Sequence, residues 1–599
     1  MTIKIDNLQG FKSMLFIRVL FQLPSLLVLL LIVTIAQAGE SSKKIIVDKT
    51  ECNDGLDNDG DGYIDYAFDL GCYGPSDISE HSSDRSTENG WTTFDKPPST
   101  LIYYISTDGN DENTGLSPLD PFATFEQARK LLLRKKRGWV LFKRGDIFDF
   151  LVDLTNIHGE SKANPILISS YGHSLERPIF NNKISAIKSS SNIYIIGLHT
   201  KVTKPSASNS HFSGVRFVGS HMNISLEDNR VDYGQVIFQR YGDDAVLKNI
   251  SIRRNIISRA YSMDSHAQGL FVSGADNLLI NQNFFDHNGW LVQSSSHGRE
   301  HDRAQATIFN HNMYINGSSN IAIHDNLIFR ASSMGIKMRS DKQGLSQNIS
   351  IKRNIFYEGE IGVGIGGNTS EKFRFVNAAV EGNVFLSLGS GKPTNRNISW
   401  PIAAKDIRGL KVSNNIIAHQ EQHKGSYALK MTKSIEDAVI KNNIVYGVDE
   451  VGFILNNDNW RNISFEDNII HDSKHSQSKA IITSGSLEGL EFINNKTFLW
   501  RKNDNWLESL FLSIKRLTTH RDYFSEYTDQ GLEFVEAMGF RAPNRDLQSY
   551  FEQFNNSIED KDIMDSIIKN RSRFLWNEKY TAESISKYIS DGFELNSQE

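Results

Sequence analysis

The chain has few cysteines and few prolines, and neither sign of charge dominates it. Two cysteines in 599 residues exclude a disulfide-rich scaffold and a four-cysteine zinc site, although they leave room for one disulfide. Twelve prolines exclude a collagen-like or proline-rich stalk. Sixty-five basic and 71 acidic residues give a net charge of −6, so no basic surface for general nucleic-acid binding is expected. Hydrophobic residues make up 39%, which excludes disorder over most of the chain.

The first 38 residues have the pattern of an export signal. Lys12 and Arg18 flank the entry to an apolar run, and a small-x-small cleavage site follows at residues 36–38. An uncleaved membrane anchor is the alternative, because the run is nearly long enough to span a bilayer. Both alternatives place the rest of the chain outside the cytoplasm, secreted or in an extracytoplasmic compartment. They also leave this segment as the one expected membrane contact.

Residues 39–74 contain an acidic loop between two cysteines. Calcium binds six to eight oxygens, and carboxylates at alternate positions around a glycine turn can direct their oxygens to one centre. The loop therefore predicts a structural calcium site, and a turn cluster without metal is the alternative. Because the protein is expected to be exported, Cys52 and Cys72 are expected to form a disulfide across the loop. The predicted ligands are Asp57, Asp59, Asp61, Asp65 and Asp69.

This Asp-x-Asp-x-Asp-Gly pattern resembles the calcium loops of dockerin and of thrombospondin type 3 repeats. It differs from an EF-hand because no Glu occupies loop position twelve, so Asp65 or Asp69 would have to take that place. Residues 75–100 are rich in Ser, Asp, Thr and Pro and are expected to form a linker. Calcium is expected to be structural, and no cofactor is expected for catalysis.

Residues 101–496 repeat one short unit. The unit reads apolar-x-apolar-x-x-Asn-apolar, as in NISIRRNII and NISIKRNIF. Its Asn recurs at intervals of 26, 28, 43, 28, 29, 32, 28, 25 and 27 residues, and a period of this length is typical of a solenoid. Alternation within the unit predicts strands, and Asn at the corner, where it tolerates a left-handed backbone, is expected to form a ladder. These residues are Asn229, Asn255, Asn283, Asn326, Asn354, Asn383, Asn415, Asn443, Asn468 and Asn495.

The start of the repeat region supports a more specific fold. Residues 101–128 read as a strand, a turn and a short helix, and further strands follow at 139–145 and 165–172. This opening resembles the N-terminal cap and first coils of the pectate-lyase-like superfamily. The resemblance implies an all-β fold, a right-handed single-stranded parallel β-helix. Asn-x-Ser/Thr sequons within the repeats are interpreted as coil corners rather than as glycosylation sites; they include Asn223, Asn249, Asn348 and Asn462.

One interval between repeats, 43 residues from Asn283 to Asn326, is clearly longer than the others. Insertions in solenoids form loops on one face, which is often the binding face. We expect this loop to take part in function. The alternatives are a solvated polar loop and a histidine cluster that binds adventitious metal. Its candidate residues are His297, Arg299, His301 and His311.

The strands beside this loop can be phased. Alternate apolar residues such as Met313 and Ile315 must face the core, so the residues between them face outward. Adjacent coils lie ~4.8 Å apart, and Tyr314 is therefore expected directly beside Lys337. The alternative to a functional site is a solvated basic stripe, although aligned cations in an acidic chain favour an anionic ligand. The expected outward residues, with a glycine gap among them, are Phe271, Tyr314, Lys337, Arg339, Gly364, Gly366, Lys405 and Lys430.

Aligned cations, a phenol and imidazoles suit the chemistry of acidic polysaccharides. The C5 proton of a uronic acid is α to the carboxylate, so its removal needs a base and a cation that neutralises the developing anion. Lys337 or Arg339 is expected to neutralise the carboxylate, and Tyr314, His311 or His301 to transfer protons. Elimination then gives a lyase, and reprotonation from the opposite face gives a C5-epimerase. The candidates for substrate binding are Phe271, His297, Arg299, Lys405 and Lys430.

Two weak resemblances agree with this chemistry. Residues 301–340 are similar to the active coils of mannuronan C5-epimerases, without their Asp-Pro-His triplet. Lys337 followed by Arg353 resembles the Lys/Arg pairs of alginate lyases and chondroitinase B, without the surrounding motif. A non-catalytic glycan-binding or adhesive solenoid is the alternative. A glycoside hydrolase is disfavoured because it needs two or three carboxylates on this face, and the phased strands offer only Asp406. The protein is expected to be a monomer.

Residues 497–599 no longer carry the repeat. Apolar spacing predicts helices over 547–554, 558–569 and 582–589, with Ser557 and Thr581 as candidate N-caps. Because the end coil of a solenoid needs covering, we expect a helical cap. Carbohydrate contact is the alternative to packing for Trp500, Trp506 and Trp576.

Overall fold

The structure is a computed structural model that divides into two compact units, residues 1–95 and 96–599. The predicted export signal, residues 1–38, lies outside the described residues. Among the residues that are described, no helix is both long and apolar enough to cross a membrane. The described residues are 50–59, 64–65, 69, 71–72, 78–80, 90–94, 96, 99–201, 212–263, 265–292, 304–340, 346–367, 375–420, 426–448, 451–456, 460–472, 479–484, 488–498, 525–526, 544–554 and 560–593.

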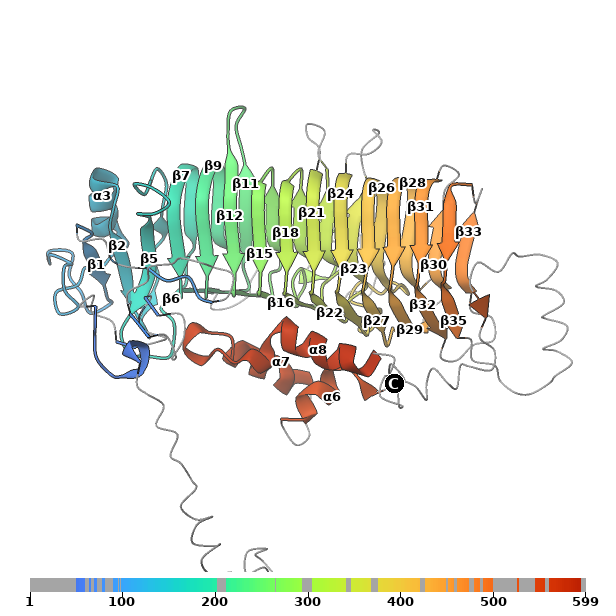
Figure 1. The fold of residues 1–599 in the computed structure, drawn as a ribbon. Helices are drawn as coiled ribbons and strands as arrows, with labels where there is room; N and C mark the ends of the chain where they lie inside the picture. The colour runs from blue at the N-terminus through green and yellow to red at the C-terminus, as the bar shows by residue number, and fades with distance from the viewer. Residues whose placement is uncertain are drawn as a thin grey trace, which may run out of the picture. The chain divides into compact units, whose positions relative to one another are not determined.

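The larger unit is a parallel β-solenoid, as the repeat predicts (Figure 1). Its strands form a 22-stranded and a 14-stranded sheet. Each strand pairs in parallel with its counterpart on the next coil, as β17 does with β20. The larger sheet bends and so forms two walls of each coil, and the smaller sheet forms the third wall. The N-terminal strands and helix are β1 (Ile102–Ile105), α3 (Phe125–Lys135), β2 (Trp139–Lys143), β3 (Ile147–Phe148), β4 (Val152–Asp153), β5 (Ile166–Tyr171), β6 (Ile179–Phe180), β7 (Ile184–Ile196), β8 (His199–Lys201) and β9 (Ser213–Glu227).

The first wall consists of β11 (Gln235–Arg240), β14 (Gln268–Ser273), β17 (His311–Asn316), β20 (Met334–Arg339), β23 (Ile361–Gly366), the first parts of β26 (Trp400–Ser413) and β28 (Tyr427–Lys441), β30 (Val451–Asn456) and β33 (Lys479–Ser484). The second wall consists of β12 (Leu247–Arg253), β15 (Asp276–Asn281), β18 (Ser319–His324), β21 (Ser346–Lys352), β24 (Phe375–Glu381), the remainders of β26 and β28, β31 (Trp460–Glu466) and β34 (Leu490–Ile493). The third wall consists of β10 (Arg230–Asp232), β13 (Ile256–Ser258), β16 (Phe284–Asp286), β19 (Leu327–Phe329), β22 (Ile355–Tyr357), β25 (Val384–Leu386), β27 (Ile416–Ala418), β29 (Ile444–Val448), β32 (Ile469–Asp472), β35 (Lys496–Phe498) and β36 (Ser525–Glu526).

The alternation along the first wall directs apolar residues into the solenoid. The alternate apolar residues of β14, β17 and β20, which include Met313 and Ile315, are each at most 1% exposed, and this confirms the predicted phase. Their neighbours at the alternate positions face outward. The inward residues are Leu270, Val272, Met313, Ile315, Ile336 and Met338.

Buried asparagines stack at the turn between the second and third walls, which confirms the predicted ladder. Asn354 is fully buried, and its Nδ2 donates to Asn383 Oδ1 at 2.9 Å and to the Ile323 carbonyl at 2.8 Å. Its Oδ1 accepts from the Asn326 backbone N–H at 3.0 Å. The left-handed backbone, however, belongs to the preceding residue, such as Arg353 with φ of 54°. The ladder Asn turns inward because it satisfies backbone groups that water cannot reach.

A second, more exposed row of asparagines runs along the second wall. Asn249 Nδ2 donates to Asn223 Oδ1 at 2.7 Å, and Asn348 Nδ2 donates to Asn320 Oδ1 at 2.8 Å. These residues adopt the left-handed backbone, with φ of 55° or 56°. Their side-chain amides already form hydrogen bonds between adjacent coils, which supports the interpretation of the sequons as coil corners.

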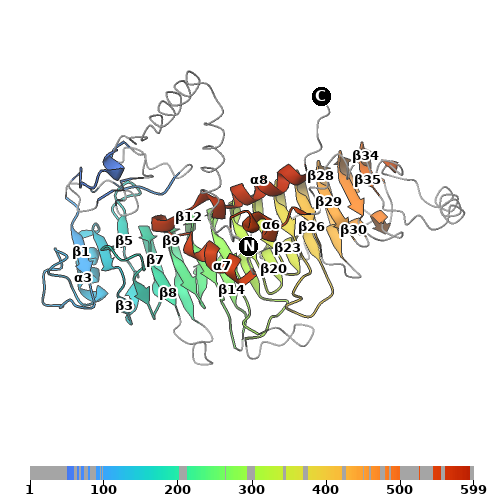
Figure 2. The same ribbon diagram turned by 90° about the horizontal axis from the view of Figure 1, so that it is seen from below.

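The tail forms α6 (Leu547–Glu552), α7 (Asp560–Lys569) and α8 (Ala582–Phe593), which lie along the third wall (Figures 1 and 2). Outward residues of that wall, such as Phe284 and Ile355, share one buried cluster with Phe551 and Ile585 of the tail. From the sequence, we expect these helices to cap the end coil. The described helices instead cover a lateral wall of the solenoid. They pack there because this wall presents a continuous apolar stripe.

Of the candidate N-caps and tryptophans predicted in the tail, Thr581 and Trp576 lie among the described residues. Thr581 Oγ1 accepts from the Ser584 N–H at 3.3 Å at the start of α8, as an N-cap does. Trp576 packs against the guanidinium groups of Arg254 and Arg571, whose carbons lie 4.7 and 4.9 Å from its ring centroid. This Trp is therefore a packing residue. Ser557, Trp500 and Trp506 lie outside the described residues.

Candidate functional site

Outward side chains of the first wall align from coil to coil in what we call the site row. Tyr314 is the register partner of Lys337, which confirms the predicted juxtaposition. Lys405 lies not in this row but in a second row, two residues further along each strand, where it pairs with Gly366. Asn316 and Arg339 are partners in the corresponding position of earlier coils. The site row is Phe271, Tyr314, Lys337, Gly364, Ala403 and Lys430.

Tyr314 is held between two other aromatic rings. Its ring meets Phe271 edge-on at 5.6 Å between centroids, and it meets His311 edge-on at 5.7 Å. Tyr314 is itself half-buried, so its ring is fixed while part of the side chain remains accessible. Packing of this kind orients the phenol without occupying its hydroxyl group.

His311 is buried and does not form part of the exposed row. It is 1% exposed, and its Nδ1 accepts from the Met334 N–H at 3.3 Å. Burial, together with the charge of Lys337, holds its pKa well below the usual range. The reason is visible in the strand, because His311 has the same parity as the inward residues Met313 and Ile315. His311 therefore supports the ring of Tyr314. Because it is buried, it is unsuited to the proton transfer to substrate that the sequence predicted for it. His297, Arg299 and His301 lie outside the described residues.

Lys337 is a half-buried cation without an ion pair among the described residues. Burial, and then the charges of Arg339 and Arg396, lower the pKa of Lys337 to about 8. Lys405 and Lys430 likewise form no described ion pair. The second wall is different, because its lysines are neutralised by carboxylates on neighbouring coils. These pairs include Lys248 with Asp276 at 3.0 Å, Lys352 with Glu381 at 2.6 Å and Lys441 with Glu466 at 3.0 Å.

Arg396 is a site residue that the sequence reading missed. It lies in the loop between β25 and β26, and it pairs with the fully buried Glu360 while its Nη2 donates to Ser333 Oγ at 2.7 Å. This anchoring brings its charge close enough to lower the pKa values of Lys337 and His311. The slightly long interval of 32 residues between two repeat asparagines was the available signal for this loop.

The glycine positions of the first wall are partly covered. A Cβ built on Gly364 would lie 2.8 Å from Met334 Sδ, so the methionine lies over that glycine. A Cβ built on Gly367 would lie 3.2 Å from Lys405 Cδ. The Met334 thioether and the stem of Lys405 therefore partly fill the expected glycine gap.

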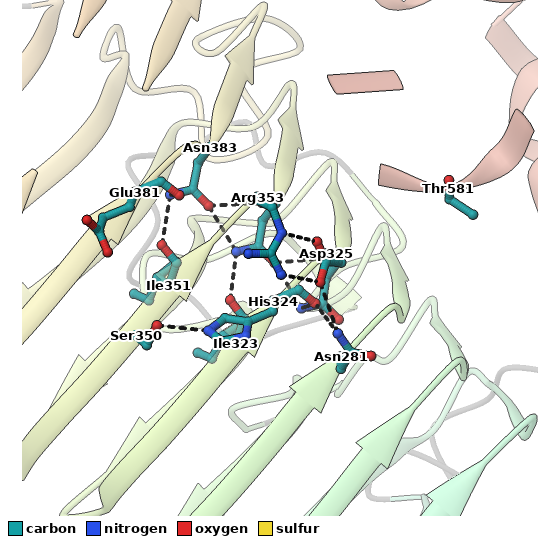
Figure 3. A network of polar contacts seen from close by, with 12 residues as sticks. Asn281, Ile323, His324, Asp325, Ser350, Ile351, Arg353, Glu381, Asn383 and Thr581 are labelled. Carbon is teal, nitrogen blue, oxygen red and sulfur yellow. Dashed lines mark hydrogen bonds and ion pairs between the residues drawn. The ribbon is translucent and has the colours of Figure 1, made fainter. Parts of the chain in front are cut away.

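Arg353 is not part of the first wall. It lies at the turn between β21 and β22 and binds both carboxylate oxygens of Asp325, at 2.7 and 2.9 Å (Figure 3). The Lys337–Arg353 pair suggested by resemblance is therefore replaced by Lys337 with Arg339 and Arg396. Asp406, the carboxylate considered for hydrolysis, is 8% exposed at a bend of β26 and accepts from the Ser434 N–H at 3.4 Å.

The smaller unit contains the acidic loop, closed by the predicted disulfide between Cys52 and Cys72. Carboxylate oxygens of Asp57, Asp59 and Glu80 lie within 4.8 Å of one another. Glu80 is fully buried and accepts from the Asn58 and Asp65 N–H groups at 2.5 and 2.9 Å. Burial raises the pKa of Glu80, and the charges of the two aspartates act in the same direction.

These carboxylates fit a hard cation, because bringing them together without one is electrostatically costly. Glu80 was missed because it follows the second cysteine, outside the recognised motif. Asp65 binds within the loop, where its carboxylate accepts from the Asp54 and Gly55 N–H groups at 2.7 and 2.9 Å. Asp69 is buried near Glu80 and Cys72. Asp61 lies outside the described residues.

The known proteins that resemble this chain are at most 13% identical among those named here, so the similarity bears on the fold and not on the activity. No protein-family model and no curated protein matches the chain. A solved GH136 lacto-N-biosidase from Eubacterium ramulus is 13% identical, with 67% of this chain and 68% of that chain covered and a TM-score of 0.35. A PL6-family alginate lyase is 9% identical, covering 72% and 53%, with a TM-score of 0.35. The A-module of an Azotobacter vinelandii mannuronan C-5 epimerase is 11% identical, covering 61% and 88%, with a TM-score of 0.32.

Proposed function

We propose that this protein is an exported enzyme that abstracts the C5 proton of a uronic acid residue in an acidic polysaccharide, as a lyase or as a C5-epimerase. The observation that carries the proposal is the adjacency of Tyr314 and Lys337 on the first wall. A proton-transfer group and a cation without a described carboxylate partner lie side by side, where a substrate carboxylate and its neighbouring C–H bond require them.

The charge arrangement supports an anionic substrate. Lysines on the second wall are paired with carboxylates, whereas Lys337, Lys405 and Lys430 have no described ion pair. Cations that the protein leaves without a counter-charge attract an external anion more strongly than neutralised ones. A polymer with a carboxylate on each residue can meet several cations that lie on different coils of one wall.

Each group then has a role in the reaction. Lys337 and Arg339 bind the substrate carboxylate and stabilise the negative charge that develops when the C5 proton leaves. Tyr314 transfers a proton at the reacting residue. In a lyase, the electron pair of the C5–H bond forms a C4–C5 double bond, the C4–O bond breaks, and the leaving oxygen takes up a proton. In an epimerase, a proton returns to C5 from the opposite face.

The direct test is incubation of the full chain with alginate, pectate and glycosaminoglycans. A lyase produces unsaturated ends, which absorb in the near ultraviolet, and an epimerase changes the C5 configuration seen by NMR. Binding without either product would support the second candidate, a glycan-binding or adhesive solenoid, which the cations without a described ion pair also favour. New reducing ends without unsaturation would indicate a hydrolase.

We propose in addition that the acidic loop binds calcium through Asp57, Asp59 and Glu80, with Asp61 as a further ligand. The ion would be structural, because it would hold the two ends of a loop closed by Cys52 and Cys72. The disulfide supports a location outside the reducing cytoplasm. The protein is proposed to act as a monomer.

A further inference from the structure

An aromatic pair lies at the opposite end of the site row from Phe271. Trp400 and Tyr427 are the first residues of β26 and β28, on adjacent coils of the first wall. Their ring centroids lie 6.3 Å apart, with the planes inclined by 21°. The Lys430 ammonium lies 3.9 Å from the Trp400 centroid and 5.6 Å from that of Tyr427. We call these three residues the aromatic platform.

The platform lies at a defined separation from Lys337. The register passes from Lys337 through Gly364 and Ala403 to Lys430, which is three steps between coils. At ~4.8 Å for each step, the two lysines are roughly 14 Å apart along the solenoid axis. The two intervening positions carry only a hydrogen and a methyl group. No large side chain of the site row itself therefore stands between the two cations, and the side chain that covers Gly364 is that of Met334, from the start of β20.

On the coil that follows Lys430, the site row continues with an apolar residue. The register partner of Lys430 on the next coil is Ile454, which is 8% exposed. A chain that lies along the row from Tyr314 would thus meet its last cation at Lys430. This gives the platform the position of a terminal binding place rather than of one more charge in a continuous stripe.

The chemistry of the platform fits an acidic sugar. An aromatic ring attracts a cation but does not neutralise it, so Lys430 remains able to bind a carboxylate. Its described contacts are the two rings, and it forms no ion pair among the described residues. Aromatic rings also pack against the C–H faces of sugars, which a peptide or a simple inorganic anion lacks.

We infer that Trp400, Tyr427 and Lys430 form a binding subsite for an acidic sugar residue, three coils away from the reacting residue at Lys337. The inference rests on the proposed function, which places the reaction at Lys337. The polymer then lies along the solenoid axis, across the strands. Only a chain several sugar residues long can occupy both places.

The experiment compares short and long substrates on the full chain. The probes are a mannuronate trimer, a mannuronate decamer and galacturonate oligomers of the same two lengths. Dissociation constants are measured by titration calorimetry in the Tyr314→Phe background, in which the proposed turnover is slowed about 10²-fold. KM is measured in protein that keeps Tyr314. Lys430→Ala and Trp400→Leu should each weaken decamer binding about tenfold or more, whereas the trimer should bind within about twofold of its original affinity.

Two further variants make the test specific. Tyr427→Leu provides an independent change should Trp400→Leu fold poorly, and retained trimer binding reports an intact first wall. Lys579→Ala is the matched control, because Lys579 also lies over an aromatic ring, 4.3 Å from the centroid of Phe554, but on the tail. It should alter neither dissociation constant.

The outcomes separate this inference from the proposed function. Unchanged decamer binding in the platform variants, or equal weakening of trimer and decamer, would overturn the subsite. A neutral xylose decamer that binds as tightly as the acidic decamers would overturn its acidic character. If the unaltered protein turned over none of the probes while the platform variants still lost decamer affinity, the proposed reaction would be rejected and the subsite retained.

Discussion

Tyr314 and Lys337 are register partners on adjacent coils of the first wall, and the Tyr314 ring is fixed by edge-on contacts with Phe271 and His311. The pair therefore combines an oriented phenol with a cation that the protein does not neutralise among its described residues. Neither side chain is needed for the alternation that holds the strand in place, because that role belongs to the inward residues. Their substitution should affect chemistry more than folding.

On a polymer that the protein converts, Lys337→Ala should lower kcat/KM by about 10²-fold or more, because it removes a charge that stabilises the developing anion. Tyr314→Phe should lower kcat by about 10²-fold, since it keeps the ring and deletes the proton-transfer group. Both are measured by steady-state kinetics, with thermal unfolding as the test of folding. Lys248→Ala, whose lysine is neutralised by Asp276 on the second wall, is the control. Losses equal to that of the control would show that the chemistry lies elsewhere.

The pH dependence distinguishes two roles for Lys337. With a pKa of about 8, it loses its charge as the pH rises through that value. As a neutralising cation it requires the proton, so kcat/KM should fall above about pH 8. A rise of kcat/KM over the same range would instead identify Lys337 as the base.

Stability should move in the opposite direction over the same range. The pKa of Lys337 is lower in the folded protein than its unfolded value of ~10.4, so the unfolded state binds more protons between these values. Stability contributed by this group therefore rises with pH in that window. Lys337→Met should remove this rise. A loss of activity above pH 8 that coincided with unfolding would contradict the assignment.

The repeating part of the molecule was predictable, and the parts that break the repeat were not. The ladder asparagines and the partnership of Tyr314 with Lys337 follow from one period and one alternation. Lys405 faces outward as expected, but it lies in a second row, because a shift of two residues along a strand keeps the same face. Arg396 comes from a loop without periodicity, so only its contact with Glu360 reveals its position.

The ladder makes a prediction that is independent of function. Asn354→Ala should lower the free energy of unfolding by about 2–4 kcal/mol, because it leaves buried partners such as the Asn326 N–H and the Ile323 carbonyl unsatisfied. Asn348→Gly is the matched control, since glycine accepts its left-handed backbone and the two hydrogen bonds that are lost, to Asn320 and from Asn377, are both exposed. Denaturant unfolding should show a much smaller effect for Asn348→Gly. Equal effects would mean that the buried ladder adds little.

Calcium should stabilise the acidic loop and leave the solenoid largely unaffected. Glu80→Gln should weaken calcium binding at least tenfold, because it removes one of three converging carboxylates while keeping the size of the side chain. The double variant Asp59→Ala, Asp61→Ala should abolish binding. Titration calorimetry with calcium, before and after chelation, measures both. Wild-type affinity in the double variant would end the calcium assignment.

The tail should detach from the third wall before the solenoid unfolds. Phe551 is fully buried in the cluster shared with that wall, and this cluster is distinct from the interior core of the solenoid. Phe551→Ala should therefore weaken tail docking by about 3–5 kcal/mol, with hydrogen exchange rising over residues 544–593 while strands of the first wall stay protected. Phe554→Ala, at a residue 39% exposed, is the matched control and should have a much smaller effect. If Phe551→Ala raised exchange equally in the tail and in β17 and β20, the tail and the solenoid would form one cooperative unit. The apolar stripe would then hold the two together too tightly for the tail to open alone.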